Sequence, residues 1–211
     1  MSPRAEPRGH PLFAAVYDLI GKAGEERVLG PLRRWVVGDA TGRVLEIGAG
    51  TGLSFPFYRR DVQLVATEPD PCMLRRARRR AAALKLPVEF HRAEAEALPF
   101  GDASFDGVVS TLVLCTVADP GRALAEVRRV LRPDGALRFV EHVRGDGWQA
   151  VAQDLVTPLW RRVGAGCHPN RPTVDTIRSA GFRVDRLEER PKAVPGPFVA
   201  GVATPDAAAG R

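Results

Sequence analysis

A short apolar segment runs directly into a glycine-rich turn, and this junction constrains the fold more than any other part of the chain. The segment Arg43–Ile47 predicts a buried strand, and residues 48–52 read Gly-Ala-Gly-Thr-Gly. Glycine permits a tight strand-to-helix turn and lets a ligand approach the backbone closely. The junction therefore indicates a ligand-binding unit at the start of an α/β sheet.

The alternation of strand and helix continues along the chain. Further strands are expected over 62–67, 88–93, 107–114 and 136–140, with helices over 72–84 and 120–131. Such repeated units predict a parallel sheet with helices on both faces. A helix over 173–180 then precedes two strands, 182–188 and 198–203, which read as a closing antiparallel pair. We therefore predict an α/β fold with a mostly parallel seven-stranded sheet and an antiparallel last strand.

The 211 residues are expected to form one domain with three additions. Residues 1–40 read as an arm and two helices, in which Phe13 and Tyr17 share one face. These two rings either close over the ligand as a lid or pack against the sheet. The domain proper spans 41–204, with an irregular insertion on the substrate side over 145–172. Residues 205–211 read as a flexible tail.

The glycine turn does not fit the two common phosphate-binding patterns. Leu53 stands where a dinucleotide fingerprint has its third glycine, and no lysine for a P-loop lies between Lys22 and Lys85. The pattern E-x-G-x-G-x-G at 46–52 instead resembles motif I of the class I S-adenosylmethionine (SAM) methyltransferases. Three later segments resemble that family in order: Glu68 after the second strand, Glu-Ala-Glu-Ala-Leu-Pro-Phe at 94–100, and Leu-Arg-Pro-Asp-Gly at 131–135.

The resemblance implies a Rossmann-like class I methyltransferase fold that binds SAM and releases S-adenosylhomocysteine. It places Glu46 near the methionine amino group, Glu68 at the ribose hydroxyls, and Glu94 with the Ala95 amide at the adenine. The full implied set is Glu46, Gly48, Ala49, Gly50, Gly52, Glu68, Pro69, Met73, Glu94, Ala95 and Thr111.

Several of these residues have a plain structural alternative. Met73 also fits a helix core position, and Asp70 reads as a helix N-cap. Only one of the alternating residues Glu94 and Glu96 can face the pocket. Glu46 and Glu68 remain open to interpretation as ordinary charges at the ends of strands.

Two further segments narrow the resemblance to the methyltransferase-like thiol S-methyltransferases and their bacterial relatives. They are Thr-Leu-Val-Leu-Cys-Thr-Val at 111–117 and Phe-Val-Glu-His-Val at 139–143, and Asp154, Pro158, Trp160 and Gly166-Cys167 continue the similarity. The resemblance implies a small-molecule acceptor, with thiol sulfur favoured over oxygen, nitrogen or carbon. Phospholipid N-methyltransferases and quinone C-methyltransferases resemble the chain more weakly.

Three residues are candidates for the acceptor side of the site: Cys115, His142 and His168. His142 ends the fifth expected strand, where α/β sheets place ligands. A thiol acceptor, with a pKa near about 8.5, needs little help from a base, whereas a phenol needs one. Direct transfer requires no enzyme nucleophile. Cys167 and His168 are adjacent, but a zinc site needs more ligands, so no metal centre is expected.

The net charge of +6 indicates a basic surface. The arginine-rich run 75–80 has no interleaved aromatic residues of the kind that stack on bases, so it reads as a solvated helix face. We expect no nucleic-acid partner and no transmembrane segment. Three cysteines without a CxxC spacing favour a reducing cytoplasm. The oligomeric state stays open, and so do an RNA or lipid methyltransferase and a SAM-binding protein without transferase activity.

Overall fold

The computed structural model describes residues 28–164, 166–190 and 196–206. The structural statements that follow concern these residues. The two N-terminal helices and the rings of Phe13 and Tyr17 were expected within residues 11–37. Of that segment, only residues 28–37 fall within the described part of the chain.

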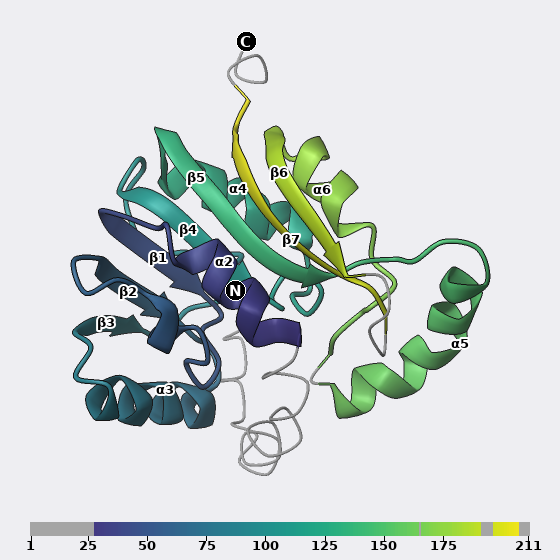
Figure 1. The fold of residues 1–211 in the computed structure, drawn as a ribbon, viewed down its shortest axis with the longest axis horizontal. Coiled ribbons are helices and arrows are strands. Elements are labelled where there is room, and N and C mark those ends of the chain that lie inside the picture. The colour runs from purple at the N-terminus through teal and green to yellow at the C-terminus, as the bar shows by residue number, and fades with distance from the viewer. Residues whose placement is uncertain (1–27, 165, 191–195, 207–211) are drawn as a thin grey trace, which may run out of the picture.

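Seven strands form one sheet in the order β3-β2-β1-β4-β5-β7-β6 (Figure 1). The first five pair in parallel, whereas β7 runs antiparallel to both β5 and β6. This confirms the predicted mostly parallel sheet with an antiparallel last strand. The strands are β1 Arg43–Ile47, β2 Gln63–Thr67, β3 Val88–His91, β4 Phe105–Thr111, β5 Leu131–His142, β6 Phe182–Arg190 and β7 Phe198–Pro205.

Helices cover both faces of the sheet, and each face has its own apolar core. One core joins Leu32 and Val36 of α2 to Ala77 of α3, and the other joins Leu124 of α4 to Ile177 of α6. The Asp70 carboxylate accepts from the amides of Cys72 and Met73, which confirms it as a helix N-cap. The helices are α2 Gly30–Val37, η2 Phe55–Phe57, α3 Pro71–Ala83, α4 Pro120–Val130, α5 Trp148–Val163 and α6 Thr173–Ser179.

Strand β4 ends earlier than its apolar sequence predicts. The expected strand ran through residue 114, but the chain turns at Leu112, whose φ is +60°. The residues that follow are buried in a loop, and buried loop residues and buried strand residues have the same apolar composition. This turn moves Cys115 away from the line of the strand.

The insertion after β5 is not irregular, because it contains the 16-residue helix α5. Hydrophobic periodicity does not predict this helix, because the large apolar side chains of α5 do not face the core. Trp148 and Leu155 are 78% and 77% exposed. No helix in the described ranges is long and apolar enough to cross a membrane.

The flexible tail predicted over residues 205–211 begins too early in the sequence, because the last strand extends into it. Pro205 still belongs to β7, and the amide of Asp206 donates to the carbonyl of Gly181 at 2.8 Å. Residues 207–211 lie outside the described part of the chain.

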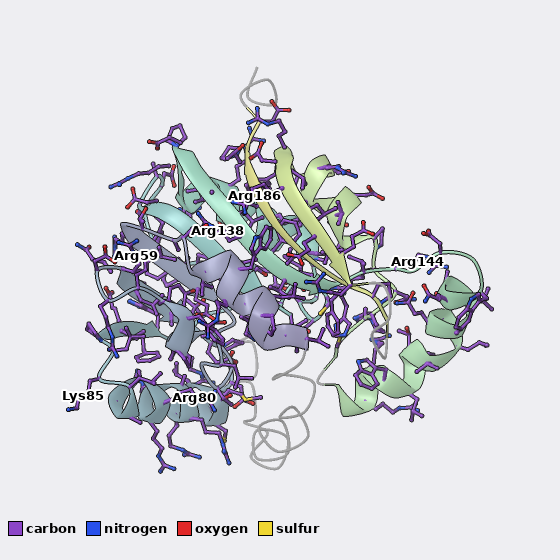
Figure 2. All side chains as sticks on the ribbon, in the orientation of Figure 1. Arg59, Arg80, Lys85, Arg138, Arg144 and Arg186 are labelled. Carbon is purple, nitrogen blue, oxygen red and sulfur yellow. The ribbon has the colours of Figure 1, made fainter. Side chains whose placement is uncertain are left out.

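Basic side chains are spread over the molecule. Arg59 and Lys85 lie on the side of β2, β3 and α3, whereas Arg144 lies beside α5 (Figure 2). Within the arginine-rich run, Arg75, Arg78 and Arg79 are exposed along α3, as expected of a solvated helix face.

Candidate functional site

The glycine turn after β1 leaves an open patch of backbone. Gly48, Gly50 and Gly52 all have positive φ angles, which residues with a β-carbon rarely adopt. A β-carbon at Gly48 would lie 2.7 Å from Val113, so the loop after β4 packs directly on the turn. A β-carbon at Gly50 would meet nothing within 4 Å. The turn therefore offers exposed backbone for a ligand at Gly50 and close packing at Gly48.

Glu68 joins the end of β2 to this turn. Its carboxylate accepts from the Gly50 amide and from the Asp70 amide, both at 2.9 Å. Burial raises the pKa of Glu68, and the two amides act in the opposite direction. Ala49 adds a second link, because its amide donates to the Thr67 carbonyl at 2.9 Å. The structure thus brings Glu68 to the turn, as the sequence predicts.

Glu46, at the end of β1, is a buried carboxylate with spare hydrogen-bonding capacity. The residue is 1% exposed, and its Oε2 accepts no hydrogen bond from the described residues. Burial raises its pKa to about 7, and the nearby Arg33 guanidinium lowers it less. The hydroxyls of Ser54 and Tyr58 act in the same direction as Arg33. A cationic ligand group beside Glu46 would compensate this carboxylate.

The other predicted cofactor residues surround the ends of β2, β3 and β4. Met73, Ala95 and Thr111 are buried, whereas Glu94 is exposed. Glu96 is used elsewhere, because its Oε1 accepts from the amides of Ala118 and Asp119 at 3.0 and 3.2 Å. The structure thus places Glu96 against the residues that precede α4 and Glu94 at the surface. Gly52 and Pro69 lie in the turns after β1 and β2.

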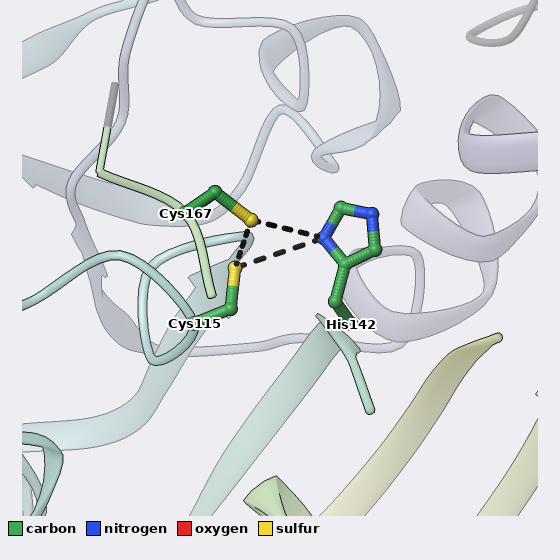
Figure 3. Close-up of side chains that lie close together, drawn as sticks. All are labelled: Cys115, His142 and Cys167. Carbon is green, nitrogen blue, oxygen red and sulfur yellow. Dashed lines mark hydrogen bonds between the residues drawn. The ribbon is translucent and has the colours of Figure 1, made fainter. Parts of the chain in front are cut away.

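A second group of side chains gathers beyond the ends of β4 and β5. Nδ1 of His142 lies 3.8 Å from Sγ of Cys115 and 3.5 Å from Sγ of Cys167 (Figure 3). The two sulfur atoms are 3.5 Å apart. All three side chains are buried. The structure thus brings Cys115 and His142 together, and Cys167 joins them.

His168 contributes to this group through its backbone. Its amide donates to the Cys115 carbonyl at 2.7 Å. Burial, followed by the charges of Arg171 and Arg161, lowers the pKa of its imidazole. The contact with Cys115, followed by that with His142, lowers the pKa of Cys167, whereas the contact with Cys167 and burial raise the pKa of Cys115.

Glu141 is a buried residue of the site to which the sequence reasoning gave no role. Its Oε1 accepts from the Ser110 hydroxyl at 2.7 Å and from the amides of Val113 and Leu114, both at 3.0 Å. Its Oε2 accepts from the Cys115 amide at 3.2 Å. One carboxylate thus shapes the loop that carries Cys115. In the sequence, Glu141 is an acid that directly follows the apolar residues Phe139 and Val140.

The segment after α5 is fastened to the same loop. The Arg171 guanidinium donates to the carbonyls of Leu114 and Val117 at 2.6 and 2.9 Å. The Thr173 hydroxyl donates to the His142 carbonyl at 3.0 Å. These contacts hold the residues around 167–173 against the ends of β4 and β5.

Comparisons with known proteins show which family the chain resembles. Residues 45–139 match the family described as Methyltransferase domain. The chain is 34% identical to the thiol S-methyltransferase TMT1B of Rattus norvegicus over 210 residues, covering 95% of this chain and 79% of the relative. It is 38% identical to the phosphatidylethanolamine N-methyltransferase of Cereibacter sphaeroides over 137 residues, covering 63% of this chain and 66% of the relative.

A solved structure shares the fold. The Thermotoga maritima protein described as a SAM-dependent methyltransferase, possible histamine N-methyltransferase, is 23% identical with a TM-score of 0.66, covering 91% of this chain and 99% of that one. The open backbone at Gly50 and the spare carboxylate oxygen of Glu46 fit SAM, which carries an ammonium group. The chain belongs to the family of class I SAM-dependent methyltransferases that includes the thiol S-methyltransferases, and SAM is its cofactor.

Proposed function

We propose that the protein methylates the sulfur of a small thiol. The observation that carries this proposal is the extent of the match to rat TMT1B. That match covers 95% of this chain, whereas the match to the methyltransferase domain ends at residue 139. The longer match therefore takes in the segment with His142 and Cys167, which forms the second half of the site.

The cofactor half of the site is assigned from the glycine turn and the acids around it. When bound, SAM supplies a methyl group on a positively charged sulfur. Glu46 would accept from the ammonium group, and Glu68 from the ribose hydroxyls. Glu94 and the Ala95 amide would hold the adenine. The turn would contact the ligand along its backbone, with Pro69, Met73 and Thr111 beside it.

The acceptor half is assigned to the surroundings of Cys115, His142 and His168. The buried surroundings of Cys115 and His142 keep water away, which favours an in-line displacement. The acceptor loses its thiol proton and its sulfur then bonds the methyl carbon as the methyl–sulfonium bond breaks. A thiol with a pKa near about 8.5 is already ionised to a few per cent at neutral pH. The site therefore needs to orient the sulfur more than to activate it.

The test is a comparison of acceptors at fixed SAM concentration. S-adenosylhomocysteine release would be measured with small alkyl and aryl thiols, with the matching alcohols and phenols, and with phosphatidylethanolamine vesicles. We expect product with thiols alone. Turnover on the vesicles alone would overturn the proposal in favour of a lipid amine. That second function is favoured by the 38% identity to a phosphatidylethanolamine N-methyltransferase.

A further inference from the structure

Three side chains that commonly bind metals converge from distant parts of the chain. Cys115 lies in the loop after β4, His142 ends β5, and Cys167 follows α5. The ligand atoms all lie within 4.8 Å of one another, and all three residues are buried (Figure 3). Within the described ranges, this is the one group of three or more histidine, cysteine or acidic residues with such spacing.

The spacing of the three atoms matches one face of a zinc tetrahedron. Bond lengths of about 2.3 Å to sulfur and about 2.0–2.1 Å to nitrogen give edges of about 3.8 Å between two sulfurs and about 3.6 Å between sulfur and nitrogen. The observed sulfur–sulfur edge is 3.5 Å, and the two sulfur–nitrogen edges are 3.5 and 3.8 Å. Shifts of a few tenths of an ångström would complete the geometry.

The backbone holds each ligand in place before any ion arrives. The Cys115 carbonyl accepts from the His168 amide, and the Cys115 amide donates to Glu141. The His142 carbonyl accepts from Thr173, and the Cys167 amide donates to the Gly164 carbonyl at 3.0 Å. Partners behind the ligands are what orient them in protein metal sites. These contacts fix the backbone around the three ligands, whereas Nε2 of the His142 imidazole has no hydrogen-bond partner among the described residues.

The charges around the cluster also fit a divalent cation. Two thiolates balance the charge of one zinc ion, and neutral histidine adds none. Among the groups behind the ligands, Glu141 is fully buried and the partly buried Arg171 guanidinium lies near both cysteines and Glu141. The filled site is thus neutral, with one acid and one arginine behind it. Sulfur and imidazole ligands in this number favour zinc over magnesium or calcium.

We propose that Cys115, His142 and Cys167 bind one Zn²⁺ ion through Sγ, Nδ1 and Sγ. Binding releases the two thiol protons to solvent. Three protein ligands leave the fourth tetrahedral position open, which is typical of catalytic zinc sites rather than structural ones. The sequence expectation of no metal centre is thereby revised, because Cys115 and His142 lie far from Cys167 in the sequence and meet it only in the fold.

The open position gives the ion a role in acceptor binding, and this step rests on the proposed function. A thiol that enters the fourth position loses its proton to solvent and binds as a thiolate, since coordinated thiols are deprotonated. Its sulfur then lies on the acceptor side of the glycine turn, which packs against Val113 two residues before Cys115. His142 then acts as a ligand and not as a base.

The metal site is tested on the full chain, purified under a phosphine reductant. We expect one zinc per chain by elemental analysis. Replacement by Co²⁺ should give the intense thiolate-to-cobalt absorption of a tetrahedral site. Cys115→Ser, Cys167→Ser and His142→Asn should each weaken zinc binding by more than about 100-fold, because losing a direct ligand costs more than losing a hydrogen-bond partner behind a ligand. Cys72→Ser is the matched control and should bind zinc normally, because Cys72 lies on α3.

The outcomes separate the metal from the acceptor. Wild-type protein that binds neither zinc nor cobalt overturns the metal site, and this result needs no variant to fold. Equal loss of zinc binding in Cys72→Ser overturns it as well. A change in the cobalt spectrum on adding a thiol supports coordination of the acceptor. Stoichiometric zinc with an unchanged spectrum overturns that step alone. Zinc binding without methylation of any thiol contradicts the proposed function and leaves the metal site standing.

Discussion

At the scale of single residues, Glu46 shows how burial prepares a charge for a ligand. The carboxylate is enclosed at the end of β1. Burial raises its pKa to about 7, because it outweighs the lowering effect of the Arg33 guanidinium of α2. Ser54, just before η2, and Tyr58, just after η2, both lie beside this carboxylate. Arg138 of β5 lies near Tyr58. Near neutral pH, Glu46 of the free protein is thus partly protonated, and a cationic group beside it would favour the carboxylate.

This charge predicts a pH-dependent affinity for SAM. Ionised Glu46 is destabilising in the free protein, because its folded pKa lies above its unfolded value. Its contribution to stability is therefore present below about pH 4.5 and is lost as the pH rises through about 7. An ammonium partner favours the ionised form, so SAM should bind more tightly as the pH rises from 6 to 8. Below the pKa, the change approaches tenfold per pH unit.

Isothermal titration across this pH range checks the expectation. The isosteric variant Glu46→Gln should bind SAM more weakly at pH 8 and with a nearly constant affinity over the range. A wild-type affinity that stays constant from pH 6 to 8 would show that Glu46 does not face the ammonium group.

At the scale of elements, α5 is unusual because polar contacts, and not its large apolar side chains, hold it against the rest of the molecule. Its large apolar side chains point outward, and a buried glutamine fastens it. The Gln153 amide donates to the carbonyls of Val143 and Pro169 at 3.0 and 2.9 Å and accepts from the Gly145 amide at 2.7 Å. Strands β1, β2 and β4 could be predicted because each carries a buried apolar run. Helix α5 could not, because hydrophobic periodicity does not register polar contacts of this kind.

On α5, replacing a polar residue should therefore lower the unfolding free energy more than replacing a large apolar one, the reverse of what is expected for most helices. Gln153→Ala removes three hydrogen bonds and should cost about 2–3 kcal/mol of unfolding free energy. Leu155→Ala, at a position 77% exposed, should cost less than about 0.5 kcal/mol. Urea unfolding gives the totals, and amide hydrogen exchange over 148–163 localises them. Slow exchange of α5 retained in Gln153→Ala would refute the idea that this residue fastens the helix.

At the scale of the whole molecule, the two halves of the site differ in how far sequence reveals them. The cofactor half follows from a contiguous turn and from Glu68, which lies at the end of the adjacent strand. The proposed acceptor half depends on Cys115, His142 and Cys167 meeting across three elements, and on the buried Glu141 that shapes the loop. No spacing in the sequence encodes these contacts, since they arise from the sheet order and from the path of the chain after β5.

The proposed cofactor half bridges the neighbouring strands β1 and β2, so SAM should stabilise the molecule as a unit. A ligand at about 100 times its dissociation constant adds about 2.7 kcal/mol to the unfolding free energy, and a single cooperative transition should shift upward. Glu68→Gln should reduce this shift, because the carboxylate that links Gly50 to Asp70 loses one of its two accepting oxygens. Glu89→Gln is the control, at a half-exposed acid on β3. Calorimetry of each variant with and without SAM separates the loss of ligand binding from the loss of intrinsic stability. An equal SAM shift in Glu68→Gln and in wild type would remove Glu68 from the cofactor site.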